Sequence, residues 1–416
     1  MMKKYWKLTT LTIFIVAVIG ALYIQTSLAK NSFPEFVIKH QSGDKAEVKP
    51  LKVIGNYRAN EMNYIYTEIS DQGTSYRNYE SSYLYLLKED YLQSEMKHLI
   101  KNYRSFMRGK QDEQIYSFFE DQNILTFAGL KSEYIYTHHG RWTYSLVVDV
   151  LDKKTNKNTA FELAIPEDEK YNYINIQGVQ LINDELKIIT TNEPLSNNEY
   201  YAQEEIHIYT VDLDTQKIVE DLEISSTTAD LESNQWHSIY GVYKGADIGP
   251  NKYFVLQEEI REEVMLDDDY YDHQTIASQY IVYHFESGEQ ESIHLPDEYG
   301  VELYPELLNG STIYFSRDTD DGIEIIGYDL ENKQIQSDQT FALPQAGDNI
   351  FSQSLIIDDK IYIVQHQNEG IVDSTILIGN IETGEVLYEG SIELTTAGKN
   401  QQVEKMHINE IRVNKE

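Results

Sequence analysis

The chain has 416 residues, of which 41% are hydrophobic and 12% aromatic, so it can bury a sizeable core and lacks the composition of a disordered protein. It contains no cysteine, which excludes disulfides, thiol catalysis, cysteine zinc sites and lipid attachment to an N-terminal cysteine. The net charge of −35 predicts that it repels nucleic acid and anionic lipid surfaces. Solubility, or adaptation to a salty or alkaline exterior, explains such a charge. Binding of divalent cations or of a basic partner is the functional alternative.

The first 29 residues form a separate segment. Three lysines, Lys3, Lys4 and Lys7, precede an uncharged run from Leu8 to Ala29. The apolar part of that run, residues 8–24, has the length of a membrane-spanning helix. The lysines predict that the N-terminus stays in the cytoplasm.

Two fates are open to this segment. If it stays in place, residues 1–29 are a cytoplasmic N-terminus and transmembrane anchor, and residues 30–416 are an extracytoplasmic domain of a single-pass protein in the cell membrane. Ser27-Leu28-Ala29 resembles a signal cleavage site. A cleaved signal, and hence a secreted protein, is the alternative.

Short runs rich in β-forming residues begin soon after this segment. They predict a first group of four strands, interrupted by the polar turn Ser70–Ser75. The four runs are residues 35–39, 51–57, 62–69 and 82–87.

The period of the apolar residues then changes from that of a strand to that of a helix. A single helix is predicted at roughly 91–108, with Asp90 as N-cap and Gln93 at the capping-box position. We expect it to be inserted and to pack on the β-domain, the alternative being a helix that binds a partner. Its apolar face would consist of Leu92, Met96, Leu99, Ile100, Tyr103 and Met107.

From residue 113 onward the chain reads as strands joined by two kinds of hairpin. In the first kind an alternating apolar run precedes a polar turn and another run follows it. Its four copies are Asp212-Leu213-Asp214-Thr215-Gln216, His284-Phe285-Glu286-Ser287-Gly288, Asp329-Leu330-Glu331-Asn332-Lys333 and Asn380-Ile381-Glu382-Thr383-Gly384. They recur at intervals of 72, 45 and 51 residues, a spacing typical of propeller blades.

The second kind of hairpin precedes the first in each repeat. Its turns are Asn183-Asp184, Asn309-Gly310 and Asp358-Asp359, with Gly249-Pro250 as a looser copy. Two hairpins in fixed order make a four-stranded meander, which is one blade of a propeller.

The sequence therefore predicts an all-β fold, a β-propeller with six blades, seven being the alternative. The predicted blades are residues 34–88, 113–166, 171–224, 236–296, 302–344 and 350–394. A last strand, Met406 to Val413, is left over. We expect it to complete one blade with strands from both ends of the chain, because such a seam replaces a frayed end with hydrogen bonds.

The segment from Asn380 to Tyr388 resembles the outer hairpin of quinoprotein-type (PQQ-like) propeller blades, whose pattern is Asp-x-x-Thr-Gly-x-x-x-Trp. It departs at both ends, with Asn380 in place of Asp and Tyr388 in place of Trp. The resemblance covers about a fifth of the chain, and it implies the fold only, with no quinone site and no dehydrogenase activity.

One carboxylate-rich turn is a candidate metal site. Asp318, Asp320 and Glu324 offer oxygen ligands, and Gly322 permits a sharp bend, which suits calcium. The full twelve-residue calcium loop is absent, so a plain turn is the alternative. The sequence indicates no other cofactor.

A second candidate is the acidic stretch from Glu258 to Asp272. It lengthens the fourth blade and predicts a solvated excursion between strands, with a recognition loop as the alternative. The residues predicted to bind are Asp267, Asp268, Asp269, Tyr270 and Tyr271. The adjacent histidines His138 and His139 could bind a ligand together only in a turn.

No G-x-S-x-G, P-loop, H-E-x-x-H or G-x-G-x-x-G motif occurs in the sequence. The sequence thus indicates a membrane-anchored extracytoplasmic propeller that binds a protein partner or ligand in the cell envelope, more than an enzyme. The alternative function is a propeller-type hydrolase acting on envelope carbohydrate, for which paired carboxylates would be needed.

Overall fold

The structure, a computed structural model, describes most of the chain after residue 32. The described residues are 10–12, 14–16, 18, 33–58, 64–77, 94–110, 114–135, 141–195, 204–225, 234–242, 248–267, 270–296, 299, 303–343, 350–367, 370–395 and 406–414. They divide into two compact units. One comprises residues 1–88, 320–322 and 341–416, and the other residues 89–319 and 323–340.

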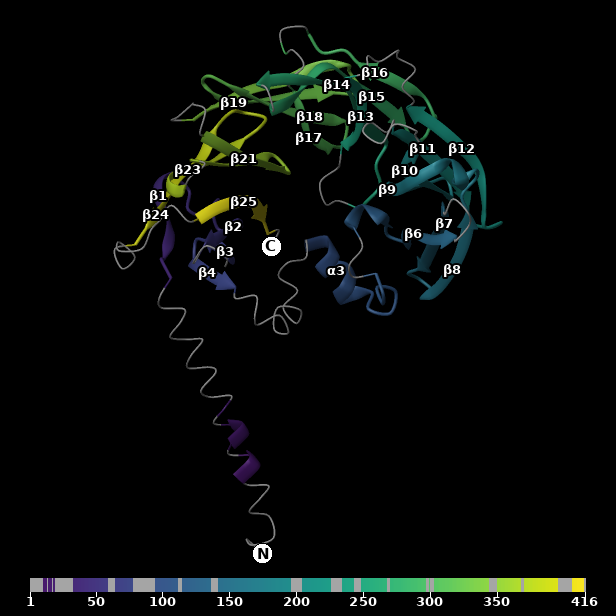
Figure 1. Ribbon diagram of the computed structural model, residues 1–416, viewed down its shortest axis with the longest axis horizontal. Coiled ribbons are helices and arrows are strands. Elements are labelled where there is room, and N and C mark those ends of the chain that lie inside the picture. The colour runs from purple at the N-terminus through teal and green to yellow at the C-terminus, as the bar shows by residue number, and fades with distance from the viewer. Residues whose placement is uncertain are drawn as a thin grey trace, which may run out of the picture. The chain divides into compact units, whose positions relative to one another are not determined.

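Six antiparallel sheets of four or five strands account for nearly all the regular structure, which matches a β-propeller (Figure 1). We number them as blades 1 to 6 along the chain. Blades 2 to 5 lie in the second unit, where each is a four-stranded meander whose strands pair in sequence order.

The strands of blades 2 and 3 are β5 (Phe118–Glu120), β6 (Ile124–Ile135), β7 (Arg141–Asp152) and β8 (Lys157–Ala164), then β9 (Tyr171–Ile182), β10 (Glu185–Pro194), β11 (Glu205–Asp212) and β12 (Lys217–Ser225). Those of blades 4 and 5 are β13 (Gln235–Val242), β14 (Tyr253–Asp267), β15 (Tyr270–His284) and β16 (Gln290–Ile293), then β17 (Tyr304–Asn309), β18 (Thr312–Thr319), β19 (Gly322–Asp329) and β20 (Gln334–Ala342). These blades begin and end within a few residues of the predicted limits.

Apolar residues at alternate positions join these blades face to face. Leu146 and Val148 of β7 share a core with Ile174 and Ile176 of β9. Three blade-to-blade cores of this kind run from blade 2 to blade 5. Burial of one face of every strand in this way is why the sequence alternates with a period of two.

The first unit holds two blades that each combine strands from both ends of the chain. The sequence predicts one such blade, completed by the last strand, and blade 1 confirms that prediction; blade 6 is a second one that the sequence does not predict. In blade 1 the C-terminal strand β25 (Met406–Val413) pairs with β2 (Leu51–Arg58), followed by β3 (Tyr64–Ser70) and β4 (Gly73–Arg77).

Blade 6 has five strands. It consists of β21 (Ile350–Ile357), β22 (Lys360–Gln367), β23 (Gly370–Asn380) and β24 (Val386–Leu394), with the N-terminal strand β1 (Phe36–Gly43) added beside β24. One apolar core, which includes Phe36, Leu51, Ile378 and Met406, joins the two blades of this unit.

The order of the first strands differs from the prediction. The run at 35–39 belongs to blade 6, because β1 pairs with β24 and not with β2. The predicted polar turn Ser70–Ser75 is shorter, since β4 already begins at Gly73 and pairs back on β3. The predicted strand at 82–87 lies outside the described residues.

A single α-helix, α3 (Ser94–Asn102), occurs in the part of the chain described after residue 32. It is shorter than the predicted 91–108, because the chain leaves the helix at Asn102 and continues in turns up to Gly109, whose φ is +82°. Asp90 and Leu92 lie outside the described residues. Met96 and Leu99 pack with Phe118 and Leu125 of blade 2, so the helix is an inserted element docked on that blade. The two short 3-10 helices are η3 (Ile115–Ser117) and η4 (Asp168–Lys170).

The recurring five-residue turn ends on a residue with positive φ in all four copies. In Asp212 and Asn380, the first residue, the side-chain oxygen Oδ1 accepts a hydrogen bond from the backbone N–H three residues on, at 2.7 and 2.9 Å. The fifth residue has a positive φ, which is why glycine stands there as Gly288 and Gly384. Asp152 to Asn156, between β7 and β8, forms a fifth turn of this geometry.

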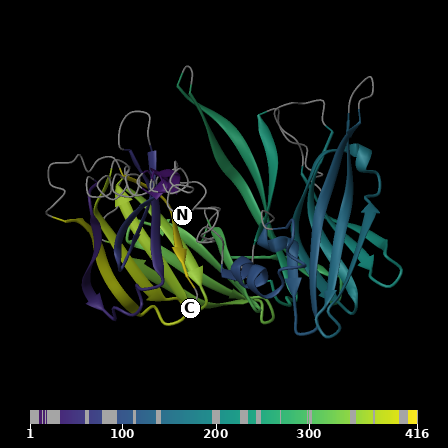
Figure 2. The ribbon, with the colours of Figure 1, turned by 90° about the horizontal axis from the view of Figure 1, so that it is seen from below.

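The acidic stretch from Glu258 to Asp272 is not an excursion between strands. It contains the last two thirds of β14 and the first three residues of β15, which pair from Tyr253–His284 to Asp267–Tyr270 and run past the other strands of blade 4 (Figure 2). Alternate acids are compatible with a strand when their carboxylates are partnered. Glu259 is 4% exposed and accepts from Gln257 at 2.8 Å and from Arg261 at 2.7 Å.

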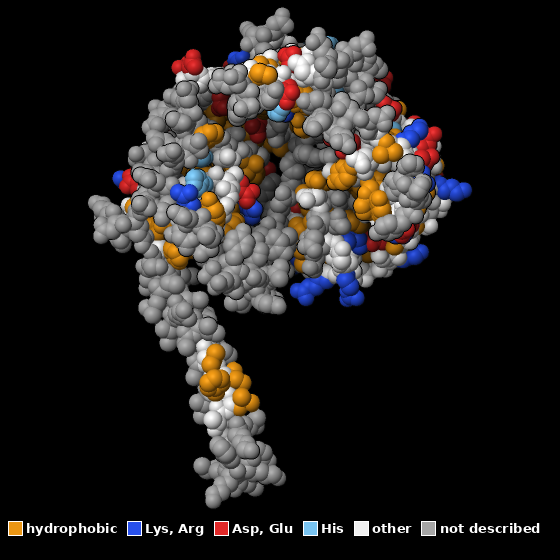
Figure 3. All heavy atoms as spheres, viewed as in Figure 1, with side chains coloured by type: hydrophobic (Ala, Val, Ile, Leu, Met, Phe, Trp, Pro, Cys, Tyr) orange, Lys and Arg blue, Asp and Glu red, His pale blue; other side chains and the backbone are white. Residues whose placement is uncertain are grey.

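Only seven residues of the predicted anchor are described. Residues 10–12, 14–16 and 18 are helical, and their apolar side chains are exposed, with Phe14 at 65% and Val16 at 63% (Figure 3). Among the described residues, no helix has both the length and the apolar character needed to cross a membrane. The other residues of the predicted span 8–24 lie outside the described residues.

Candidate functional site

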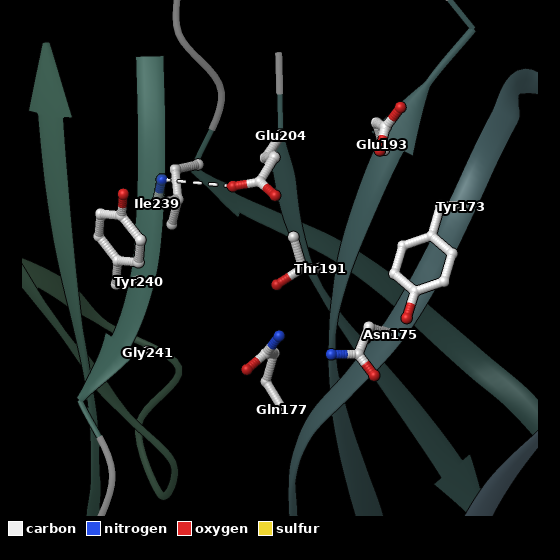
Figure 4. Close-up of a pocket in the computed structure, with 9 residues that line it drawn as sticks. All are labelled: Tyr173, Asn175, Gln177, Thr191, Glu193, Glu204, Ile239, Tyr240 and Gly241. Carbon is white, nitrogen blue, oxygen red and sulfur yellow. Dashed lines mark hydrogen bonds between the residues drawn. The ribbon is translucent and has the colours of Figure 1, made fainter. Parts of the chain in front are cut away.

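A pocket of about 230 Å³ lies between blades 3 and 4 (Figure 4). Blade 3 contributes side chains from β9 and β10, together with the residue before β11, and blade 4 contributes the edge strand β13. The lining residues are Tyr173, Asn175, Gln177, Thr191, Glu193, Glu204, Ile239, Tyr240 and Gly241. Seven of them carry polar side chains, and none is cationic.

Strand periodicity gathers these residues on one face. Tyr173 lies directly across from Glu193, and Asn175 across from Thr191, so the four side chains share one face of the β9–β10 ladder. Gln177 follows Tyr173 and Asn175 at the same period of two and also lines the pocket, next to a bulge near Gly178 where the register shifts. The amide and hydroxyl groups of Asn175, Gln177 and Thr191 lie between the two tyrosine rings in Figure 4.

The two carboxylates of the pocket have different surroundings. Glu193 accepts a hydrogen bond from Asn172 Nδ2 at 2.8 Å. Glu204 is partly buried and receives the N–H of Ile239 at 3.5 Å, too long for a strong hydrogen bond. Burial raises the pKa of the Glu204 carboxyl, the bond from Ile239 opposes that rise, and the nearby Glu193 adds to it.

Two tyrosines flank the pocket. Tyr173 is 55% exposed and Tyr240 is 41% exposed, so both rings keep a free surface. The guanidinium of Arg261 lies 5.5 Å from the centre of the Tyr240 ring and is held there by its ion pair with Glu259 at 2.7 Å. Exposed aromatic faces beside amide and carboxylate groups are suited to a small polar ligand that also has apolar edges.

On the opposite face of blade 3 lies a second polar group, centred on His207. The imidazole Nδ1 is 2.7 Å from Asp221 Oδ1, and Nε2 is 3.2 Å from Glu205 Oε2 and 3.1 Å from the Tyr171 hydroxyl. Burial raises the pKa of Tyr171 to about 12, so its hydroxyl keeps its proton. In the described part of the chain, Glu205, His207 and Glu223 are the group whose donor atoms converge closely enough to hold a metal.

The sites predicted from the sequence lie elsewhere. Asp318 is in β18, Asp320 is in the following turn and Glu324 is in β19, where its carboxylate forms an ion pair with Arg317. Calcium binding there remains a prediction. Asp267 and Tyr270 are paired at the tip of the β14–β15 hairpin, and Tyr271 pairs with Met265. Asp268 and Asp269 lie outside the described residues, as do the adjacent histidines His138 and His139.

The sequence contained a signal for both groups that the prediction did not use. Four polar residues in a row, Thr190-Thr191-Asn192-Glu193, follow the apolar residues of β10, and His207 stands between the buried Ile206 and Ile208 of β11. Polar residues inside a buried strand need partners, so they mark places where side chains converge.

No family model and no curated protein matches the chain. Solved structures match it at 9–12% identity, among them the β-propeller domain of the Trilobed protease from Pyrococcus furiosus (12% identity, 65% of this chain and 80% of that chain, TM-score 0.23). AztD from Citrobacter koseri matches at 9% identity over 82% of this chain and 95% of that one, with a TM-score of 0.32. TolB from Acinetobacter baumannii matches at 9% identity over 93% and 84%, with a TM-score of 0.28. The chain spans only 42–61% of the length of four other solved chains that it matches. None of these matches assigns an activity.

Proposed function

We propose that this protein is an extracytoplasmic β-propeller that binds a small polar ligand, neutral or cationic, in the pocket between blades 3 and 4. The observation that carries the proposal is the composition of the pocket lining: two carboxylates, three amide or hydroxyl side chains and two half-exposed tyrosines, without a cation.

Charge and size limit the ligand. Two carboxylates with no lysine or arginine in the lining repel an anion and favour a ligand that donates hydrogen bonds or carries an ammonium group. The volume of about 230 Å³ is smaller than the roughly 300–1,000 Å³ of pockets for drug-sized molecules. A single sugar ring or a molecule of similar size fits both limits.

Three sugars of one ring size test the charge argument. Glucosamine is cationic below neutral pH, N-acetylglucosamine is neutral and glucuronate is anionic. We expect glucosamine, and more weakly N-acetylglucosamine, to raise the melting temperature of the protein by mass action, and glucuronate to leave it unchanged. Stabilisation by glucuronate would contradict the proposed pocket, and so would a melting temperature that none of the three sugars raises.

Glu204→Gln separates binding from folding. Loss of a charged acceptor should weaken binding of the glucosamine probe by about tenfold or more. The same substitution should stabilise the free protein at neutral pH. The Glu204 carboxyl has a higher pKa in the folded protein than in the unfolded chain, so the free energy of unfolding falls as the pH rises from the unfolded pKa to the folded one. Glutamine does not titrate, so the variant does not lose this stability.

Glu286→Gln is the matched control, because it removes one negative charge from an exposed turn outside the pocket. It should change neither binding nor the slope of stability against pH. If Glu204→Gln behaves like this control, Glu204 is an ordinary surface carboxylate and the proposed pocket loses its main contact.

The second candidate function is a hydrolase acting on envelope carbohydrate. It is favoured by the carboxylate pair Glu193 and Glu204, of which one holds its proton more tightly than an ordinary glutamate. Release of reducing ends from cell-wall polysaccharide, abolished by both Glu193→Gln and Glu204→Gln, would establish the enzyme in place of the binding protein.

The proposed location rests on the N-terminal sequence. The uncharged run after three lysines supports an anchor with residues 30–416 outside the cytoplasm. Protease added to cells stripped of their wall should then degrade that part. Ile15→Asp with Val18→Arg should leave the protein in the cytosolic fraction, whereas Ile15→Leu with Val18→Ile should not. A wild-type protein protected from protease and found in the cytosol would refute the location.

A further inference from the structure

The group around His207 has the arrangement of a metal site on a rigid sheet. Glu205 and His207 are two positions apart on β11, and Glu223 of β12 lies directly across from His207. Side chains at i, i+2 and the cross-strand position project from one face, so three ligands are set by backbone pairing alone. His207 is buried, with its side chain 7% exposed, while Glu223 is exposed and leaves a path to solvent.

This face is separate from the pocket. Ile206 alternates with Glu205 and His207 along β11, and it packs in the core that blade 3 shares with blade 4. Tyr209, which continues the His207 side of the strand, packs instead in the core shared with blade 2. The pocket is lined by blade 4, so the two sites use opposite faces of blade 3.

The imidazole is already oriented for a metal. Asp221 Oδ1 lies 2.7 Å from Nδ1, and the Tyr209 ring stacks on the imidazole at 5.7 Å with an interplanar angle of 13°. A carboxylate that accepts the Nδ1 proton fixes the tautomer with Nε2 unprotonated, which is the state that binds a metal.

The donor atoms of the three residues converge on one point beside Nε2. Glu205 Oε2 lies 3.2 Å from Nε2, and the donor atoms of Glu205, His207 and Glu223 all lie within 4.8 Å of one another. The Tyr171 hydroxyl lies 3.1 Å from Nε2 and occupies the position that a divalent cation would take between the imidazole and the two glutamates.

We propose that Glu205, His207 and Glu223 bind a divalent transition metal of the Zn²⁺ class, with Asp221 as the group that orients His207. One imidazole and two carboxylates are a donor set that suits Zn²⁺, and the imidazole disfavours Ca²⁺ and Mg²⁺, which prefer oxygen alone. Three protein ligands on an accessible face leave a fourth position for water. When the metal binds, the Tyr171 hydroxyl gives up its 3.1 Å contact with Nε2.

Calorimetry of the purified full-length chain with Zn²⁺ tests the site. We expect one Zn²⁺ per chain, binding weakened beyond detection in His207→Gln, and affinity lowered at least about tenfold in Glu223→Gln. Glu223 is exposed, so its replacement leaves folding intact even if His207→Gln destabilises the protein. Asp221→Asn should lower the affinity about 10–100-fold, as expected for a group that orients a ligand.

Co²⁺ gives a second readout, since a site of this kind produces visible absorption bands that depend on the imidazole ligand. His284→Gln is the matched control: His284 is also paired with a glutamate, Glu291, at 3.1 Å, but it lies on blade 4, and no third ligand converges on it among the residues that the structure describes. It should leave Zn²⁺ binding unchanged. No Zn²⁺ binding by the wild-type chain, or equal affinity in wild type and Glu223→Gln, would overturn the proposal and leave His207 as a structural ion pair.

Discussion

Met406→Ala should lower the free energy of unfolding by about 2–5 kcal/mol, the range for a buried methionine truncated in a core. Met406 is 1% exposed and lies in β25, whose pairing with β2 completes blade 1. Its side chain packs in the core that joins blades 1 and 6, together with Phe36 and Tyr388. The substitution therefore weakens both the seam and the core behind it. Urea denaturation followed by tryptophan fluorescence measures the effect.

Met265→Ala is the control, because Met265 is also in a strand, β14, but is 58% exposed. It should cost less than about 0.5 kcal/mol. Equal, small losses for both variants would mean that β25 does not hold the blade closed. Partial proteolysis should agree, with Met406→Ala cut near the C-terminus before the rest of the chain.

The repeating hairpins made most of this fold predictable. The turns beginning at Asp212, Asp329 and Asn380 each need a side-chain hydrogen-bond acceptor at the first position and a residue with positive φ at the fifth. Both requirements concern neighbouring residues, so they can be recognised in the sequence. The strand Met406–Val413 was predicted as the seam, because an odd strand at the end of a closed array has an unpaired edge to fill.

Long-range pairing was less predictable than local turns. The residues Phe36–Gly43 do not indicate that this strand pairs with β24, some 350 residues away, because the residues of a strand predict a strand and not its partner. The stretch from Glu258 to Asp272 is predicted as an excursion between strands because a segment rich in charged residues is usually exposed to solvent. Hydrogen bonds along β14, from Gln257 and Arg261 to Glu259, supply partners that composition alone cannot reveal.

The pocket and the group around His207 were less predictable from the sequence than the strand pairing. Tyr173 and Tyr240 belong to different blades and meet only after both have folded, so no spacing in the sequence links them. Glu205, His207 and Glu223 come from one hairpin, and their i, i+2 and cross-strand positions could have been found once the register of β11 and β12 was known. The turn that begins at Asp212 determines that register approximately, with a bulge between Thr210 and Val211 shifting it by one residue before it reaches His207.

A buried ion pair in blade 2 gives the other large effect. Lys110, just after the turns that follow α3, forms an ion pair with Asp149 of β7, and both side chains are 11% exposed. Its ammonium also donates to Phe106 O at 2.7 Å and lies 4.4 Å from the centre of the Phe106 ring. The pair therefore fastens the segment after α3 to the sheet.

Lys110→Met should cost about 3–5 kcal/mol, because it leaves the Asp149 carboxylate buried without its cation. The contrast is Lys39→Met, which breaks an exposed pair with Glu393, the two side chains being 60% and 46% exposed, and should cost no more than about 1 kcal/mol. Adding Asp149→Leu to Lys110→Met should recover most of the loss, since an apolar residue in place of the carboxylate removes the unpaired charge. The urea midpoints of the single, double and control variants measure these changes in stability. If the double variant is as unstable as Lys110→Met, the cost comes from lost packing of the lysine stem against Phe106, and the ion pair itself contributes little.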